Sequence, residues 1–316
     1  MAKRFIGARQ TTVAREIVLT GKGVHSGAPV SITIHPAEAD SGIRFLVAQD
    51  DDTTAEITAD VHSVANLTLC TVLGNGRGAH VATVEHLLAA LRGLSIDNVY
   101  VEIDSGEVPI MDGSAVDFVE ALDEVGIREL PVPRKFIKVL KTIRVEEGDC
   151  WGEIRPHAGF HLDLEIEFDT PLIGRQRAAM EISPGVFRAE LSRARTFGFM
   201  RDVQKLWAAG RALGASLDNT VVIGEDKIVN PEGLRYADEF VRHKMLDAVG
   251  DLALAGAPLL CAYRSVRGGH RLNAHVVKAL LADREAWVLV HAPRVRDLAP
   301  AETVRALTAS YASDRS

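Results

Sequence analysis

The sequence is poor in cysteine, and its three cysteines lie far apart. Cys70, Cys150 and Cys261 are odd in number and form no CxxC pair. A disulfide framework needs a closely spaced even set, and a thiolate zinc site needs paired cysteines. We therefore expect neither kind of site, and any metal centre has to use other side chains.

Basic residues and long apolar segments are also scarce. The chain has 36 Lys and Arg against 43 Asp and Glu, a net charge of −7, which argues against a protein that coats nucleic acid. A local basic pocket for an anionic ligand stays open. The longest apolar run, residues 252–263, is interrupted by Gly256 and Pro258 and is too short to span a hydrocarbon core of ~30 Å. Residues 1–10 carry basic side chains with no apolar segment after them, unlike a secretion signal. We expect a cytoplasmic location and no transmembrane segment.

The remaining composition is typical of a soluble globular protein with a substantial core. Of the 316 residues, 47% are hydrophobic and 25% are charged. At ~100–200 residues per domain, this length predicts two domains. Two prolines in residues 130–133 block a helix and favour extended geometry, so we place the linker there. The expected domains are residues 1–130 and 134–300, followed by a loosely held tail, 301–316.

Each half combines strands with helices and predicts an α+β fold. Residues 34–45 and 154–162 share a faint pattern, Ile-x-Pro followed by a glycine and a further strand. In both halves a histidine lies early in a helix that follows strands. These similarities indicate a duplicated unit with a site between the copies.

Local patterns give three further expectations. Residues 67–73 are expected to form a strand, ahead of a hairpin turn at residues 74–78. Thr83 is a natural N-cap for a helix over residues 84–91. Ser114 is expected to cap a second helix that runs to Leu122.

Residues 240–252 form the most informative helix of the chain, between a turn at 231–233 and a stop at 256–258. His243, Asp247 and Asp251 are spaced by four residues and therefore share one stripe of that helix. Apolar side chains cover its opposite side. A His and an Asp at this spacing can hold one metal ion. The alternative is that the polar stripe simply faces water.

Two histidines and one carboxylate suit a catalytic zinc that keeps a position for water. His86, His243 and Asp247 supply that set, and Glu85, next to His86, is placed to take a proton from metal-bound water. The pattern differs from the HExxH zinc motif. For His86 the alternative is a histidine packed in a helix.

Other polar side chains are candidates for the same site. His270 follows two glycines at an expected helix start, and Asp251 can keep it protonated; an ordinary helix-start histidine is the alternative. Thr196 offers a hydroxyl to an oxyanion, or is structural. Arg242 and Lys244 give cationic groups for a phosphate-bearing substrate, or lie on a solvated face.

Five motifs together resemble one enzyme family. The resemblance spans residues 10 to about 287, and the turn at 23–27 also fits. The motifs are TVEHL (83–87), IMDGSA (110–115), SRARTFGF (192–199), RHKMLDAVGDL (242–252) and GHRLN (269–273). The sequence is similar to the UDP-3-O-acyl-N-acetylglucosamine deacetylase family, zinc hydrolases of the committed step of lipid A synthesis in Gram-negative bacteria.

This resemblance implies specific roles, all expectations at this stage. One zinc ion (or ferrous iron) is bound by His86, His243 and Asp247. Glu85 is the general base, and His270, supported by Asp251, is the acid or electrostatic partner. Thr196 assists the oxyanion, while Lys244 and Phe197 contact the nucleotide-sugar.

The resemblance also implies an architecture and partners. The fold is two α+β sandwiches facing each other, the second with an insert at about residues 197–225 that holds the acyl chain. Apolar side chains of this stretch suit such a passage: Phe197, Phe199, Leu213, Leu217 and Val221. The expected partner is a small acylated nucleotide-sugar, and the protein is expected to act as a monomer. Rival functions are deacetylation of another acylated sugar amide, or silent binding of a nucleotide-sugar.

Overall fold

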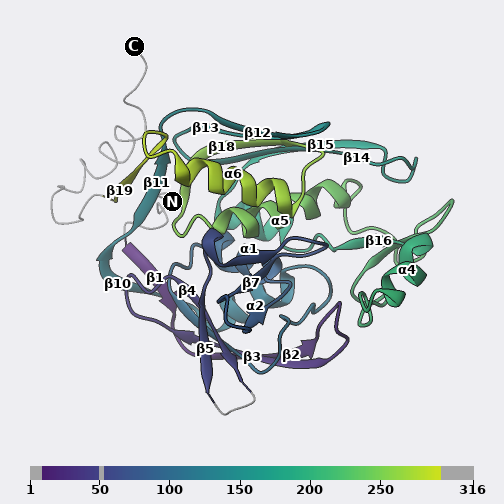
Figure 1. The fold of residues 1–316 in the computed structure, drawn as a ribbon, viewed down its shortest axis with the longest axis horizontal. Helices are drawn as coiled ribbons and strands as arrows, with labels where there is room; N and C mark the ends of the chain where they lie inside the picture. Colours follow the sequence, from purple (N-terminus) through teal and green to yellow (C-terminus); the bar gives the residue numbers. More distant parts are fainter. Residues whose placement is uncertain (1–8, 50–52, 293–316) are drawn as a thin grey trace.

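Two mixed sheets enclose a layer of helices in the computed structural model, which describes residues 9–49 and 53–292. In Figure 1 one sheet lies above the helices and the other below them. The lower sheet has the order β2 (Ile17–Lys22), β3 (Pro29–Pro36), β9 (Val99–Ile103), β4 (Ile43–Ala48) and β5 (Thr54–Thr58). Its helices are α1 (Glu85–Gly93) and α2 (Val116–Val125). The arrangement confirms the expected α+β class.

The upper sheet repeats this plan further along the chain. Its strands are β12 (Ile143–Glu147), β13 (Cys150–Pro156), β18 (Leu259–Val266), β14 (Phe160–Glu167) and β15 (Arg175–Glu181), in that order, extended by β11 (Lys135–Val139) and β19 (Trp287–His291). Its helices are α5 (Glu239–Ala253) and α6 (His270–Ala282). In the lower sheet, β9 pairs antiparallel with β3 and parallel with β4. In the upper sheet, β18 likewise pairs antiparallel with β13 and parallel with β14. The shared topology confirms the duplicated unit that the faint sequence pattern predicted.

Alternating side chains build the core between each sheet and its helices. Along β3, Val30, Ile32 and Ile34 are buried while the residues between them are partly exposed. Helix α1 is buried along almost its whole length because it lies between its own sheet and α5. At the contact of α1 with α5, a Cβ on Gly250 would lie 2.0 Å from the carbonyl oxygen of Glu85. Glycine at this position therefore allows the two helices to approach closely.

Smaller elements connect the two halves. β1 (Arg9–Val13) pairs with β10 (Ile127–Pro133), so the proline-containing segment predicted to be a linker is extended as expected but also hydrogen-bonded. β6 (Val64–Asn66), β7 (Val72–Gly74) and β8 (His80–Val81) form a three-stranded sheet, followed by α1. A short helical segment, α3 (Pro184–Val186) and η2 (Phe187–Leu191), precedes the insert. The domain boundaries stay a prediction, and residues 301–316 lie outside the described part.

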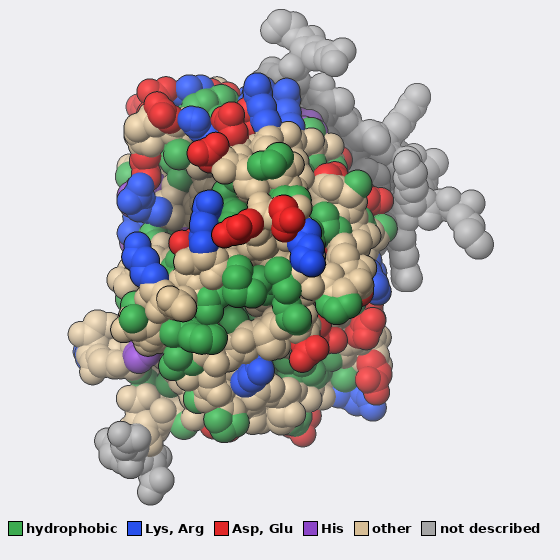
Figure 2. Space-filling model, turned by 90° about the vertical axis from the view of Figure 1, so that its right-hand side faces the viewer, with side chains coloured by type: hydrophobic (Ala, Val, Ile, Leu, Met, Phe, Trp, Pro, Cys, Tyr) green, Lys and Arg blue, Asp and Glu red, His purple; other side chains and the backbone are tan. Residues whose placement is uncertain are grey.

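The expected insert lies beside the two sheets, at the right of Figure 1. Its elements are β16 (Phe197–Phe199), η3 (Met200–Asp202), α4 (Val203–Ala208) and β17 (Val221–Ile223). β16 and β17 pair in parallel, apart from the two large sheets. Seen from this side, hydrophobic side chains gather on the surface (Figure 2), and the insert contributes exposed Met200, Trp207, Leu213 and Leu217.

Three local predictions need correction. Thr83 is not the N-cap of α1: its φ is +57°, Val84 occupies the cap position without a side-chain bond, and the Thr83 hydroxyl donates to Glu107 instead. Residues 67–71 are not a strand, because Leu69 has a φ of +71° and the chain turns there before β7 begins at Val72. Ser114 accepts from the Val116 N–H at 3.2 Å, but Ala115 is the N-cap of α2.

Candidate active site

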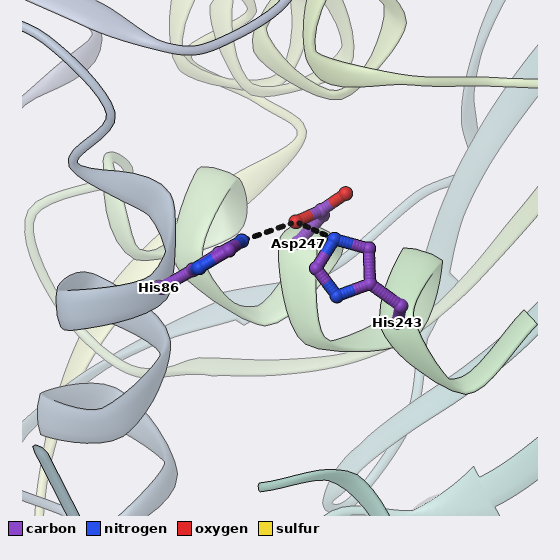
Figure 3. Close-up of side chains that lie close together, drawn as sticks. All are labelled: His86, His243 and Asp247. Carbon is purple, nitrogen blue, oxygen red and sulfur yellow. Dashed lines mark ion pairs between the residues drawn. The ribbon is translucent and has the colours of Figure 1, made fainter. Parts of the chain in front are cut away.

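Helices α1 and α5 bring two histidines and one aspartate together at their crossing (Figure 3). His86 comes from α1, and His243 and Asp247 come from successive turns of α5. Asp247 Oδ1 lies 3.5 Å from His86 Nε2 and 3.4 Å from His243 Nε2. One ligand atom from each residue lies within 4.8 Å of the others, and no other such group occurs among residues 9–49 and 53–292.

The polar stripe of α5 therefore faces the protein interior, and the alternative of a water-facing stripe is wrong. His243, Asp247 and Asp251 are each at most 2% exposed. Buried ionisable side chains are costly unless they are paired or hold a metal. The prediction from spacing was right about the shared face, and the crossing with α1 supplies the reason for its burial.

The atoms facing the centre fit a divalent cation. Asp247 Oδ1 is buried and accepts no hydrogen bond within the described part of the chain, an unusual state for a carboxylate oxygen. His243 Nδ1 lies 3.0 Å from the Ala194 carbonyl oxygen, which only accepts, so the proton is on Nδ1 and Nε2 is free to ligate. Burial lowers the pKa of His243 to about 3, which keeps the ring neutral as a ligand must be.

Asp247 is held as a carboxylate. Burial acts to raise its pKa, but the interactions with the neighbouring His243 ring and the Lys244 ammonium outweigh that effect and hold the pKa well below its usual range. Lys244 Nζ donates to Asp247 Oδ2 at 2.7 Å, leaving Oδ1 for the centre. Two imidazoles and one carboxylate are the donor set that zinc accepts at catalytic sites.

Glu85 lies beside this donor set without joining it. Its Oε2 accepts the Thr71 N–H at 3.0 Å, and its Oε1 lies 3.8 Å from His270 Nε2. Burial raises the pKa of Glu85, and the positive charge of His270 opposes that rise. A carboxylate of raised pKa next to a metal position suits a general base.

His270 opens helix α6 and lies beside the donor set, close to Glu85. Its Nε2 lies 4.0 Å from Asp247 Oδ2, and its Nδ1 lies 2.9 Å from Asp251 Oδ2. Burial acts to lower the pKa of His270, but the carboxylates of Asp251 and Glu85 outweigh it and raise the pKa to about 10. The ring is therefore protonated at neutral pH and has an N–H for an oxyanion or a leaving amine.

Residues that hold the site together were missed in part by the sequence analysis. The backbone N–H of Thr71 donates to Glu85, and its hydroxyl donates to Asp251 Oδ1 at 2.7 Å. Asn273 Nδ2 donates to Asp251 Oδ2 at 2.8 Å, and the Tyr263 hydroxyl donates to Asn273 at 2.7 Å. Asn273 closes the GHRLN motif, but no sequence signal marked Thr71, because the residues around it read as a strand.

A buried ion pair supports the backbone that orients His243. Arg195 is 2% exposed, and its Nε lies 2.9 Å from Glu239 Oε1. The Arg195 backbone N–H donates to the same carboxylate, and the carbonyl of that same peptide group, Ala194 C=O, accepts from His243. Arg195 belongs to the SRARTFGF motif, but its role follows only from the fold.

The other predicted residues lie at the edge of the centre. Lys244 Nζ is 5.6 Å from the centre of the Phe197 ring, and the Phe197 ring packs against Phe240 and lies 6.1 Å from His243. Thr196 is partly exposed, and its backbone N–H donates to the Gly113 carbonyl at 2.7 Å. These positions suit contacts with a substrate, and the roles given to them stay predictions.

A cavity of about 680 Å³ opens next to His270. Arg267, Arg271 and Lys278 line it, together with Glu147, which accepts from Arg271 Nε at 2.7 Å. The segment before β7, residues 64–68, forms its other wall. This local basic pocket is compatible with the negative net charge of the whole chain, as the composition allowed.

Comparison with known proteins agrees with this site. Residues 10–282 match the model of the UDP-3-O-acyl N-acetylglycosamine deacetylase family. Proteins of Brucella ovis, Brucella abortus and Brucella melitensis named UDP-3-O-acyl-N-acetylglucosamine deacetylase are each 54% identical over 288 residues, covering 91% of this chain and 100% of their own length. The chain belongs to this family. The resemblance inferred from the five motifs is thereby confirmed.

The deacetylase family motif IMDGSA contacts the second half of the chain rather than the metal position. Gly113 accepts from Thr196, and Asp112 Oδ2 lies 2.7 Å from Arg235 Nη1. A Cβ on Gly113, whose φ is +86°, would lie 2.0 Å from the Asn219 carbonyl oxygen.

None of the helices in the described residues has the length and hydrophobicity needed to cross a membrane.

Proposed function

We propose that this chain is a zinc-dependent amide hydrolase that removes the N-acetyl group from UDP-3-O-acyl-N-acetylglucosamine and releases acetate, the committed step of lipid A synthesis. The single observation that carries the proposal is the convergence of His86, His243 and Asp247 beside Glu85 and His270. Family membership supports the substrate. The retained acid and base groups argue against a silent nucleotide-sugar-binding homologue.

The chain's own groups divide the chemistry of amide hydrolysis between them. Zinc, when bound, would supply Lewis acidity to the scissile carbonyl and lower the pKa of a water molecule. The Glu85 carboxylate accepts the proton of the attacking water. Protonated His270 stabilises the developing oxyanion with Nε2–H or gives its proton to the leaving amine, while Asp251 keeps the ring charged. The Thr196 hydroxyl is a second donor for the oxyanion.

Three surfaces near the centre suit different parts of the substrate. The cavity with Arg267, Arg271 and Lys278 suits the nucleotide diphosphate, and Lys244 with Phe197 suits the sugar. The apolar insert suits the acyl chain. The active unit is expected to be a monomer. The cytoplasmic location stays a prediction.

The metal assignment is tested by metal analysis of the purified protein. We expect about one zinc per chain and an activity that is lost on chelation and restored by zinc. The doubly substituted His243→Ala, Asp247→Ala protein should lose the metal while Arg242→Ala, on the same helix, keeps it. Stoichiometric zinc in the double variant would show that the ligands lie elsewhere.

A further inference from the structure

A loop of the first half of the chain holds the middle of the insert. This 23–27 loop connects β2 to β3, and the insert backbone rests on it at residues 212–214. The N–H of Leu213 donates to the His25 carbonyl at 3.1 Å, and the N–H of Gly214 donates to the Val24 carbonyl at 3.0 Å. The Ala212 N–H also donates to His25 Nδ1, at 3.4 Å.

The two main chains lie too close together for a side chain to fit between them. A Cβ on Gly214 would lie 2.1 Å from the Gly23 carbonyl oxygen, and a Cβ on Gly27 would lie 3.2 Å from the Leu213 backbone. Glycines at both sides of the contact therefore allow main chain to pack on main chain. The position of residues 212–214 is therefore tied to that of the 23–27 loop by close main-chain contact.

One buried carboxylate, that of Glu107, fixes the position of this loop. Its Oε1 accepts from the His25 N–H at 2.8 Å and from the Thr83 hydroxyl at 3.0 Å. Its Oε2 accepts from the N–H of Ser26 at 2.8 Å and from the Ser26 hydroxyl at 2.6 Å. Glu107 is only 4% exposed, so these four donors are what stabilise its charge in the interior.

The insert wall next to this contact is apolar. Leu213 belongs to the hydrogen-bonded segment itself, and Leu217 follows four residues later; both are exposed. Exposed leucines on a surface that faces an acylated substrate bind its chain by removing apolar area from water. The placement of the wall therefore depends on Glu107, which contacts neither the wall nor the metal ligands in the described structure.

We propose that Glu107 is a positioning residue for acyl-chain selectivity: it holds the 23–27 loop, and the loop sets the position of the insert wall at residues 212–214. The inference rests on the proposed deacetylase function. It predicts that weakening the Glu107 contacts affects long acyl chains more than short ones, because only a long chain reaches the wall.

The test compares kcat/KM for two substrates that differ only in the 3-O-acyl group, butyryl or tetradecanoyl. Glu107→Gln leaves a single acceptor oxygen for two backbone N–H groups, so it loosens the loop without changing side-chain size. We expect kcat/KM for the tetradecanoyl substrate to fall on the order of tenfold, with a change below about twofold for the butyryl substrate. Gly214→Ala, which separates the same contact from the insert side, should shift selectivity in the same direction.

Controls separate selectivity from general damage. Glu102→Gln removes an exposed carboxylate of β9 that pairs with His35 of β3, and both substrates should keep their kcat/KM. Ser26→Ala removes one of the four donors and should give a smaller shift in the same direction, which covers the case in which Glu107→Gln does not fold. Equal losses for both substrates in the Glu107, Gly214 and Ser26 variants would overturn the inference.

A binding measurement distinguishes failure of this inference from failure of the proposed function. The deacetylated amine products with butyryl and tetradecanoyl chains are titrated into each protein by calorimetry. Glu107→Gln should weaken binding of the tetradecanoyl product alone. If the unsubstituted enzyme released no acetate yet this selective loss remained, the proposed activity would be wrong and the role of Glu107 would stand. Unchanged affinity for the long product would contradict that role.

Discussion

At the scale of single residues, the groups proposed as proton acceptor and proton donor are held by different neighbours. Glu85 and His270 lie within 3.8 Å of each other but have different supports, Thr71 for Glu85 and Asp251 for His270. The two groups also differ in charge, since the His270 ring is protonated and positive at neutral pH. Two titratable groups held this way suit opposite roles in one reaction.

Substituting either group should lower turnover without removing the metal. Glu85→Gln and His270→Gln should each reduce kcat by ~10²-fold or more, because each removes a proton-transfer or oxyanion contact. Metal content, measured on the same samples, should stay close to that of the unsubstituted protein. Loss of zinc in Glu85→Gln would make Glu85 a ligand. A near-normal kcat in His270→Gln would leave Glu85 as both base and acid.

The pH dependence of turnover should report the charge of His270. Its pKa is raised to about 10, so the protonated form exists at neutral pH and is lost as the pH rises through that value. The rate should therefore fall on the basic side. Asp251→Asn removes the largest contribution that raises this pKa, so the basic limb of kcat should move to lower pH. A basic limb that stays in place would assign it to another group.

At the scale of elements, the crossing of α1 and α5 brings the three proposed metal ligands together. Each helix alone carries only part of the donor set, and the crossing depends on Gly250 facing the Glu85 carbonyl. The catalytic geometry is thus a property of helix packing.

Gly250→Ala should separate the two helices. The added methyl would overlap the Glu85 carbonyl, and overpacking of this kind costs about 1–3 kcal/mol of unfolding free energy. Zinc affinity should fall as well, because His86 moves away from His243 and Asp247. Denaturant unfolding and competition with a chelator measure both effects. Gly185→Ala, where a Cβ meets nothing closer than 4.0 Å, is the matched control. Unchanged zinc affinity in Gly250→Ala would disconnect the crossing from the site.

Elements with strong local periodicity were predictable from the sequence. The spacing of His243, Asp247 and Asp251 gave α5 and its shared face, and the observed helix extends the expected range by one residue at each end. The burial of that face was not predictable from spacing, because it depends on α1, more than a hundred residues away. Only the resemblance supplied it in advance.

Predictions from local sequence patterns were wrong where tertiary contacts determine the backbone conformation. Thr83 has the side chain of a helix cap, but its hydroxyl donates to Glu107 and its φ is positive. Thr71 lies in a segment with a strand-like composition, yet the chain turns at Leu69 and presents Thr71 to Glu85 and Asp251. Both departures occur beside the site, where function competes with local preference.

At the scale of the whole molecule, two copies of one α+β plan face each other and share a single centre. The first copy supplies His86 and Glu85, and the second supplies His243, Asp247, Asp251 and His270. Neither copy holds the full donor set. Duplication followed by specialisation therefore accounts for one asymmetric site between two similar folds.

The most direct test of the account measures acetate release from UDP-3-O-acyl-N-acetylglucosamine, together with zinc content, in one titration. Zinc is added stepwise to chelator-treated protein. The account predicts that acetate and free amine form in equal amounts, and that the rate rises with zinc until about one ion per chain is bound. A full rate in metal-free protein, or one bound zinc per chain without acetate release, would contradict it.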